Sequence, residues 1–293
     1  MFAGTIQGLL AMPPRPSPSD VPSLVYLAAF AANSLAIVCA SSSPFVVPLV
    51  LLQGLFFVGA LEMTHQCVHH AFLVSSRRSN EFVGHLAASL IGFNLVAYRY
   101  FHLSHHRHVC DTDDPEGALY QDSPRTRWFA LVAPIAHVYV AIGINRTAAR
   151  YVPPQRRAAW RIARLGTWGM LLALAVWASL SPRTFLLAYL IPLALFAWFD
   201  FPFSQAEHYG AQIVSPDAAR DVSLASLDVA TPVLFSALML HRNLHRVHHV
   251  WPRTRWFEAP ERMKELDVVQ PGRVLTLGAF ARTWWDGGPR LWP

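Results

Sequence analysis

Histidine is the residue type with the clearest chemistry in this chain, because eleven of its fourteen copies fall into three short clusters. The clusters lie within 65–70, 102–108 and 241–249, and His208 stands alone between the last two. The pattern HxxHH occurs in both the second and the third cluster. Imidazole binds iron, zinc, copper and nickel, so this repetition indicates a metal site.

The spacing predicts how the imidazoles converge. Residues i, i+3 and i+4 share one face of a helix, so we expect each HxxHH pattern to present its three imidazoles to a single point. The nine predicted ligands are His65, His69, His102, His105, His106, His208, His245, His248 and His249. A hydrolytic zinc site needs only about three protein ligands. Nine exceed the positions around one octahedral ion and fit two ions that each keep an open position.

Other residues near these nine remain open in role. Candidates for further ligands, or for outer partners that fix an imidazole, are His70, His241, Glu207 and Asp114. Candidates for outer partners only, or for surface salt bridges and helix caps, are Glu62, Asp113 and Asp228. Residues that we interpret as structural are the isolated His85 and His137 and the small thiols Cys67 and Cys110.

The composition indicates the kind of scaffold that holds these side chains. The 293 residues are 53% hydrophobic and only 14% charged, with a mean hydropathy of +0.29, whereas soluble domains carry about 25% charged residues. We therefore predict an all-α integral membrane protein. The net charge is +6, and almost all of the basic residues are arginines. These arginines flank apolar stretches, which is typical of topology signals and not of nucleic-acid binding.

Apolar stretches predict four membrane spans, since a span needs about 20 mostly apolar residues. We place them at about 21–40, 44–63, 166–180 and 184–199. They belong to a single domain, 21–293, behind a flexible arm, 1–20. The remaining segments, 64–165 and 200–293, form a helical cap that holds a histidine-ligated di-metal site.

Charge and parity predict the orientation. The first turn carries no charge, whereas Arg77 and Arg78 follow the second span, so the positive-inside rule places the cap in the cytoplasm. The histidine clusters can meet only if the number of crossings between them is even. We therefore assign 128–144 to the interface or to a cytoplasmic layer, and we expect 82–98 to be interfacial or re-entrant.

Four motifs together resemble the membrane-bound fatty acid desaturase and hydroxylase superfamily, which includes carotenoid ketolases and alkane hydroxylases. The motifs are HxxxHH from His65, HxxHH from His102 followed by Asp113-Asp114-Pro115, Glu207-His208, and HxxHH from His245 followed by Trp251-Pro252. The resemblance covers roughly residues 22–260. It implies a non-haem di-iron centre, with O2 as oxidant and two electrons from a reductase chain.

The resemblance leaves the reaction itself open. We expect desaturation or hydroxylation of a fatty acyl or lipid-like substrate. The first alternative is a carotenoid ketolase or hydroxylase, and the less favoured one is a histidine-rich metal-binding or transport membrane protein. The sequence has no haem-binding cytochrome domain and no iron-sulfur motif, so electrons should come from a separate donor such as ferredoxin or another reductase chain. We expect the bacterial inner (cytoplasmic) membrane, with the active site facing the cytoplasm.

Overall fold

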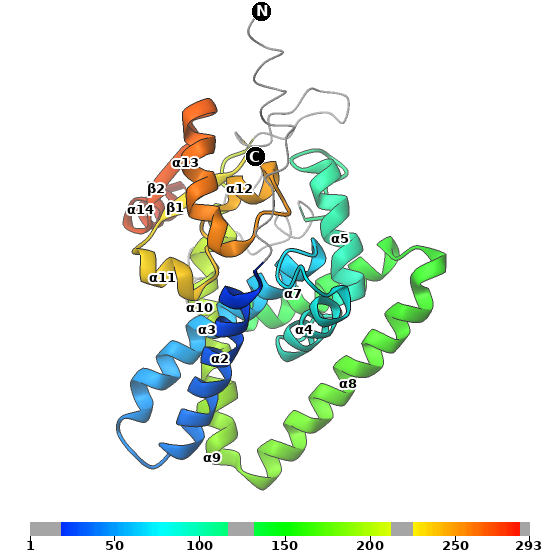
Figure 1. The fold of residues 1–293 in the computed structure, drawn as a ribbon, viewed down its shortest axis with the longest axis vertical. Helices are drawn as coiled ribbons and strands as arrows, with labels where there is room; N and C mark the ends of the chain where they lie inside the picture. Colours follow the sequence, from blue (N-terminus) through cyan, green and yellow to red (C-terminus); the bar gives the residue numbers. More distant parts are fainter. Residues whose placement is uncertain (1–18, 117–131, 212–224, 288–293) are drawn as a thin grey trace, which may run out of the picture.

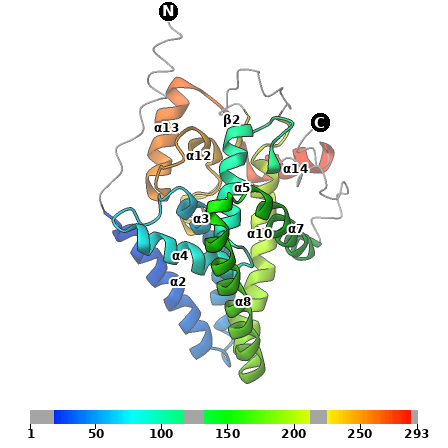
Figure 2. The same cartoon turned by 90° about the vertical axis from the view of Figure 1, so that its right-hand side faces the viewer.

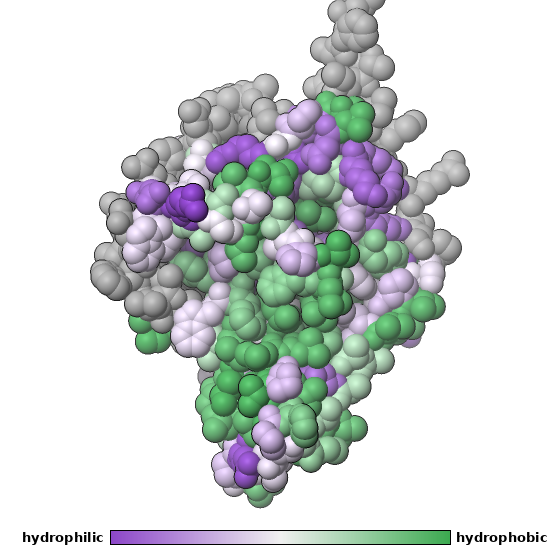
Figure 3. Space-filling view, turned by 90° about the vertical axis from the view of Figure 1, so that its left-hand side faces the viewer, coloured by the Kyte–Doolittle hydropathy of each residue, from purple (hydrophilic) through white to green (hydrophobic). Residues whose placement is uncertain are grey.

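The computed structural model describes residues 19–116, 132–211 and 225–287, and most of these residues are helical. Long apolar helices extend from one end of the molecule, and short helices with a small sheet form the other end (Figure 1). Hydrophobic residues cover the surface of the first part, whereas hydrophilic residues concentrate on the second (Figure 3). This separation is what a membrane-embedded helical bundle with a polar cap requires.

Four helical segments of the described chain are long and apolar enough to cross a membrane: Val21–Cys39 (α2), Val46–Val68 (α3), Pro154–Leu180 and Pro182–Ala206. The third contains η3 (Pro154–Arg156) and α8 (Arg157–Leu180); the fourth contains α9 (Pro182–Phe185), η4 (Leu186–Leu190) and α10 (Ile191–Ala206). The four predicted spans are thus confirmed. The last three are longer than expected, because polar and basic side chains continue each helix beyond its apolar stretch. Arginine does so readily, since its long stem lies along the helix while its charge reaches water.

Helices α2, α3 and α10 pack closely. A Cβ on Gly54 of α3 would stand 2.9 Å from the Cβ of Leu195 on α10, so this glycine allows the two helices to approach. Between α2 and α3, the Asn33 amide donates to the Gln53 side-chain oxygen at 2.6 Å, and the Gln53 amide donates to the Ser34 hydroxyl at 2.8 Å. Such bonds satisfy polar groups where lipid offers none.

Helix α8 lies apart from this group along most of its length (Figure 1; Figure 2 shows the orthogonal view). Its side chains Ile162, Leu165 and Trp168 are each at least 63% exposed. Large apolar side chains on a helix of this length fit contact with lipid.

The segment expected to be interfacial or re-entrant forms two helices, α4 (Arg77–Leu90) and α5 (Leu95–His108), which meet at 96°. Gly92 allows the bend, because its φ of +86° is accessible mainly to glycine. Asn94 then caps α5 by accepting from the Ala97 N–H at 3.0 Å. The bend matches a re-entrant arrangement. If the pair instead crossed as one broken span, the described chain would have five crossings.

The other assigned interface segment forms α7 (Ala133–Ala148), while residues 128–131 lie outside the described ranges. At 16 residues, α7 is shorter than any of the candidate spans. Its Asn145 amide donates to the Gly92 carbonyl at 2.7 Å, which fixes the turn between α4 and α5. Helix α7 thus helps to orient the helix that carries the second histidine cluster.

The remaining described elements of the cap are η2 (Ala149–Tyr151), β1 (Leu227–Ala230), α11 (Val233–Leu238), α12 (His245–Val250), η5 (Trp256–Glu258), α13 (Ala259–Val269), β2 (Arg273–Thr276) and α14 (Leu277–Gly287). Strands β1 and β2 pair in parallel, with Leu227 opposite Arg273. This two-stranded sheet was not expected from a purely helical prediction. It lies beside the third histidine cluster, because the Arg246 guanidinium pairs with Asp228 of β1 at 2.5 Å.

The start of α2 is tied to the cap through one buried carboxylate. Asp20 accepts from the Val74 and Ser75 N–H groups at 2.9 and 3.1 Å, and it pairs with Arg255 at 2.8 Å. Residues 1–18 of the expected flexible arm lie outside the described chain, whereas Asp20 is fixed. This set of contacts around Asp20, here called the clasp, links the segment at Val74 and Ser75 to the segment at Arg255.

Candidate metal centre

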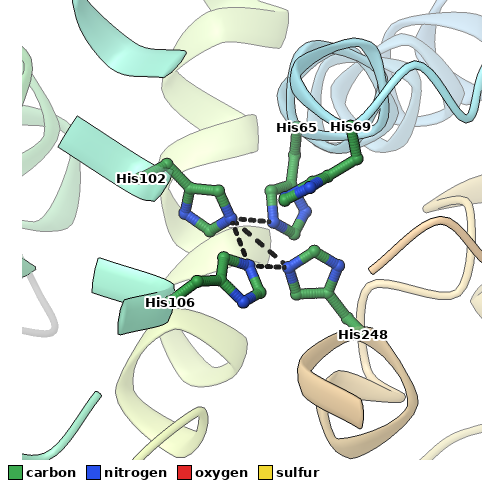
Figure 4. Close-up of side chains that lie close together, drawn as sticks. All are labelled: His65, His69, His102, His106 and His248. Atoms are coloured by element: carbon green, nitrogen blue, oxygen red, sulfur yellow. Dashed lines mark hydrogen bonds between the residues drawn. The ribbon is translucent and has the colours of Figure 1, made fainter. Parts of the chain in front are cut away.

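The nine predicted histidine ligands come together in two adjacent clusters. Cluster 1 consists of His65, His69, His102, His106 and His248, and cluster 2 consists of His105, His208, His245 and His249. In each cluster, one ring nitrogen from every histidine lies within 4.8 Å of the others. Figure 4 shows the five rings of cluster 1 turned toward a common centre. The two clusters touch, with the His106 and His249 ring centroids 4.8 Å apart.

The expectation that each HxxHH pattern serves a single point was wrong, because each pattern divides between the clusters. His102 and His106 belong to cluster 1 and His105 to cluster 2. With 3.6 residues per turn, i and i+4 lie only about 40° apart on a helix, whereas i+3 and i+4 are about 100° apart. The i and i+4 rings therefore stay together and the i+3 ring points elsewhere.

The second HxxHH pattern, which begins at His245, repeats this division in the opposite sense. His245 and His249, the i and i+4 residues of α12, enter cluster 2, while His248 enters cluster 1. Helices α5 and α12 each give two rings to one cluster and one ring to the other. The two helices that carry the HxxHH pattern lie more than 130 residues apart in the sequence, and both contribute rings to both clusters.

The membrane helices supply the other three rings. His65 lies in the last turn of α3 and His69 is its C-terminal cap residue, while His208 follows α10 by two positions. Helices α3 and α10 pack against each other. Both clusters are consequently built where two candidate spans end.

A carboxylate holds the outer nitrogen of each of three ligand rings. Nδ1 of His65 lies 3.0 Å from Glu62, and Nδ1 of His102 lies 3.1 Å from Glu116. Nδ1 of His105 lies 2.9 Å from Asp114. An acceptor at Nδ1 leaves the lone pair on Nε2, the nitrogen that faces the cluster, and fixes the orientation of the ring.

Sequence analysis had named Glu62 and Asp114 but missed Glu116, which lies at the end of a described range. Its carboxylate also approaches Nε2 of His105 at 3.8 Å, so it lies beside rings of both clusters. A signal was present, since Glu116 follows the Asp113-Asp114-Pro115 motif directly.

The ring nitrogens themselves show that the residues fit metal ions. With Nδ1 of His65 and His102 each facing a carboxylate, their Nε2 lone pairs point at one another across 2.9 Å. Two lone pairs at this distance repel unless a cation binds them. Among the described residues, the buried Nε2 atoms of His69 and His105 have no hydrogen-bond partner. Ligands about 2.1 Å from an ion stand up to about 4.2 Å from each other, which is close to the 4.8 Å within which the nitrogens of each cluster lie.

The protonation state of most of these rings also favours metal binding, since only a neutral imidazole is a ligand. Burial lowers the pKa of His69, His106 and His249 well below the usual value, and it lowers the pKa of His208 to about 3. His105 differs: burial opposes its charge, but Glu116 and Asp114 together raise its pKa to about 9.

The charges around the clusters fit two divalent ions. Five carboxylates contact the ligand rings or the arginine beside them: Glu62, Asp114, Glu116, Asp200 and Glu207. Arg242 is the guanidinium among them, so the carboxylates outnumber it and the group is negative, although burial raises the pKa of Glu116 and raises that of Glu207 to about 7. Buried charge is costly unless it is compensated. Two divalent cations would neutralise this charge.

The structure does not bring the remaining candidate ligands into either cluster. His70 faces Asn80 and Glu81, and Nδ1 of His241 lies 2.7 Å from the Ser236 hydroxyl. The Glu207 carboxylate lies 3.8 Å from Nδ1 of His245, so it is placed as an outer partner. Asp228 pairs with Arg246 and not with a histidine.

The other named residues lie apart. Asp113 groups with His108 and Asp111, a set in which Asp113 is exposed. Cys67 and Cys110 are buried and belong to neither cluster, although the Cys110 thiol lies 4.0 Å from Nδ1 of His208. His85 lies on α4, away from the site, and the side chain of His137 is outside the described part of the structure.

Fold and site together define a membrane protein with two adjoining histidine clusters, each able to hold a metal ion, at the ends of its candidate spans. The chain belongs to the fatty acid desaturase family, which matches residues 42–280. This is a family of oxidoreductases that act as desaturases and hydroxylases. A search of the curated proteins finds no match to the chain.

Proposed function

We propose that this protein uses O2 to desaturate or hydroxylate a fatty acyl or lipid-like substrate at two iron ions held by the nine clustered histidines. The observation that carries the proposal is the pairing of clusters 1 and 2 where α3 and α10 end. A site at this level meets both a chain embedded in the bilayer and an electron donor in water.

The ions would supply the redox chemistry that protein side chains lack, since they activate O2 for attack on an unactivated C–H bond. Desaturation removes two hydrogens from the substrate; with O2, two further electrons and two protons, it yields a double bond and two waters. Hydroxylation uses the same inputs and yields an alcohol and one water. The electrons come from a separate donor such as ferredoxin or another reductase chain.

The protein's own contribution is to hold the ions and to orient the rings that bind them. Glu62, Glu116 and Asp114 fix the tautomer and orientation of three ligand rings. A cavity of about 20 Å³ is lined by His65, His245 and other side chains, and so reaches rings of both clusters. This volume accommodates about one small molecule, such as O2 or water.

Surface charge favours an acyl substrate over a carotenoid. The basic residues at the base of α8 and before it are exposed, and none has an ion pair within the described chain: Arg146, Arg150, Arg156, Arg157, Arg161 and Arg164. Such a surface attracts the anionic head of a phospholipid, a coenzyme A thioester or an acyl carrier. A carotenoid has no such charge.

Lipid profiling tests the reaction. A host that expresses the chain with a suitable reductase is expected to gain an unsaturated or hydroxylated acyl species, which His106→Ala abolishes. His85→Ala is the matched control, because it removes a half-buried imidazole outside both clusters. An unchanged acyl pool, with oxidised rings in a carotenoid-producing host, would transfer the assignment to a carotenoid ketolase or hydroxylase.

The proposal places the cap in the cytoplasm of a bacterium and the chain in its inner membrane. Cysteine labelling from outside the cell tests this orientation, with Cys39→Ser as background because Cys39 is exposed at the same end of the bundle. Arg183→Cys is expected to react with an impermeant thiol reagent, whereas Arg157→Cys, at the other end of α8, is not. Labelling at position 157 alone would invert the topology.

A further inference from the structure

Arg242 lies between the carboxylates that serve the two histidine clusters. Its guanidinium is 2.9 Å from Glu207 and 3.8 Å from Glu62. Glu62 accepts from Nδ1 of His65 in cluster 1, and Glu207 lies 3.8 Å from Nδ1 of His245 in cluster 2. One guanidinium therefore contacts an outer partner of each cluster.

The guanidinium is held from its other side by α10. Nε of Arg242 donates to Asp200 at 2.5 Å, and Nη2 donates to the Ser204 hydroxyl at 3.2 Å. The Arg242 side chain is only 9% exposed. A planar guanidinium with fixed donors orients carboxylates in a way that a flexible ammonium does not. Asp200 and Ser204 thus anchor the group that orients Glu62 and Glu207.

The backbone before Arg242 is strained, which is consistent with a fixed placement of this side chain. Leu240 and His241 have φ of 55° and 58°, in the left-handed region that non-glycine residues seldom adopt. Such conformations persist only where their surroundings impose them. Here Leu240 is buried, and the His241 N–H donates to the Ser236 carbonyl at 2.8 Å.

We infer that Arg242 is a positioning residue that couples the two metal clusters by fixing Glu62 and Glu207 together. The inference rests on the proposed function only for the identity of the ions. Its consequence is specific: loss of the Arg242 guanidinium should weaken metal binding at both clusters, whereas loss of one carboxylate should weaken mainly one. Outer-partner changes at metal sites typically cost about 10–100-fold in affinity.

Anaerobic titration of the purified full-length apoprotein with ⁵⁷Fe(II), followed by Mössbauer spectroscopy, measures the binding at each cluster without turnover. Arg242→Gln is expected to raise the Kd at both clusters by about tenfold or more. Glu62→Gln should do so mainly at cluster 1 and Glu207→Gln mainly at cluster 2. Arg242→Lys keeps the positive charge but loses the planar guanidinium. Its Kd values at both clusters should lie between those of the wild type and of Arg242→Gln.

Arg255→Gln is the matched control, because Arg255 is likewise a poorly exposed, ion-paired arginine but contacts Asp20 instead of the site. It should lower thermal stability and leave both iron affinities unchanged. Wild-type affinity at both clusters in folded Arg242→Gln, or a loss at one cluster only, would overturn the inference.

If Arg242→Gln does not fold, Asp200→Asn decides, since it removes the ion pair that holds the guanidinium to α10 without altering a histidine or its acceptor. Weaker binding at both clusters supports the inference, and unchanged binding at both rejects it. Wild-type protein that binds two ions but oxidises no lipid would remove the proposed reaction and leave the role of Arg242 intact.

Discussion

Replacing His102 by alanine is expected to abolish turnover and to leave about one iron ion per chain instead of two. His102 contacts three other ring nitrogens of cluster 1, from His65, His106 and His248, at 2.9–3.3 Å. The other rings of the cluster are already committed as ligands, so no spare imidazole can replace it. The loss should exceed the roughly 10–100-fold that removal of an outer partner causes.

His249→Ala should give the same loss of turnover through cluster 2, with the ion of cluster 1 retained. Activity assays with iron analysis of each purified variant measure both effects, and His85→Ala provides the control with full iron content. Wild-type turnover in either ligand variant would show that the two clusters are not the active site.

Removing the carboxylate of Asp20 is expected to produce the largest loss of stability among changes remote from the site. Asp20→Ala breaks the ion pair with the fully buried guanidinium of Arg255 and removes the acceptor of the Val74 and Ser75 N–H groups. Breaking a buried ion pair in this way typically costs about 3–5 kcal/mol. The cost is large because the remaining charge stays buried.

Thermal unfolding of the detergent-solubilised protein measures this loss. Glu261→Gln is the control, because its partner Lys264 and Glu261 itself are mostly exposed, and exposed pairs contribute little. An unchanged melting temperature in Asp20→Ala would mean that the clasp between α2 and the cap does not form.

Much of the site could be predicted because its signal is local. The nine ligands follow from repeated spacings within short helices, and the clusters contain all nine. The division of each HxxHH pattern could not be predicted, because it depends on where α5 and α12 lie relative to each other. That arrangement is set by contacts between segments far apart in the chain.

The same distinction explains what was missed in the scaffold. Spans were evident from apolar composition, but their ends were not, since buried polar residues such as Gln66 continue α3 into the cap. Strands β1 and β2 are four residues each and pair across more than 40 residues of sequence, so neither carries a local signal. Arg242 carries no local signal either, since its contacts with Asp200 and Glu62 come from two different membrane helices and appear only in the folded chain.

Iron analysis of the purified protein tests the central claim most directly. Nine converging imidazoles in two clusters, with surrounding charge that two divalent cations neutralise, predict about two iron ions per chain and little zinc after anaerobic preparation. Elemental analysis against a quantified protein concentration gives the ratio. A single zinc ion per chain, or no bound metal in protein that is folded and was never exposed to chelator, would contradict the di-iron account.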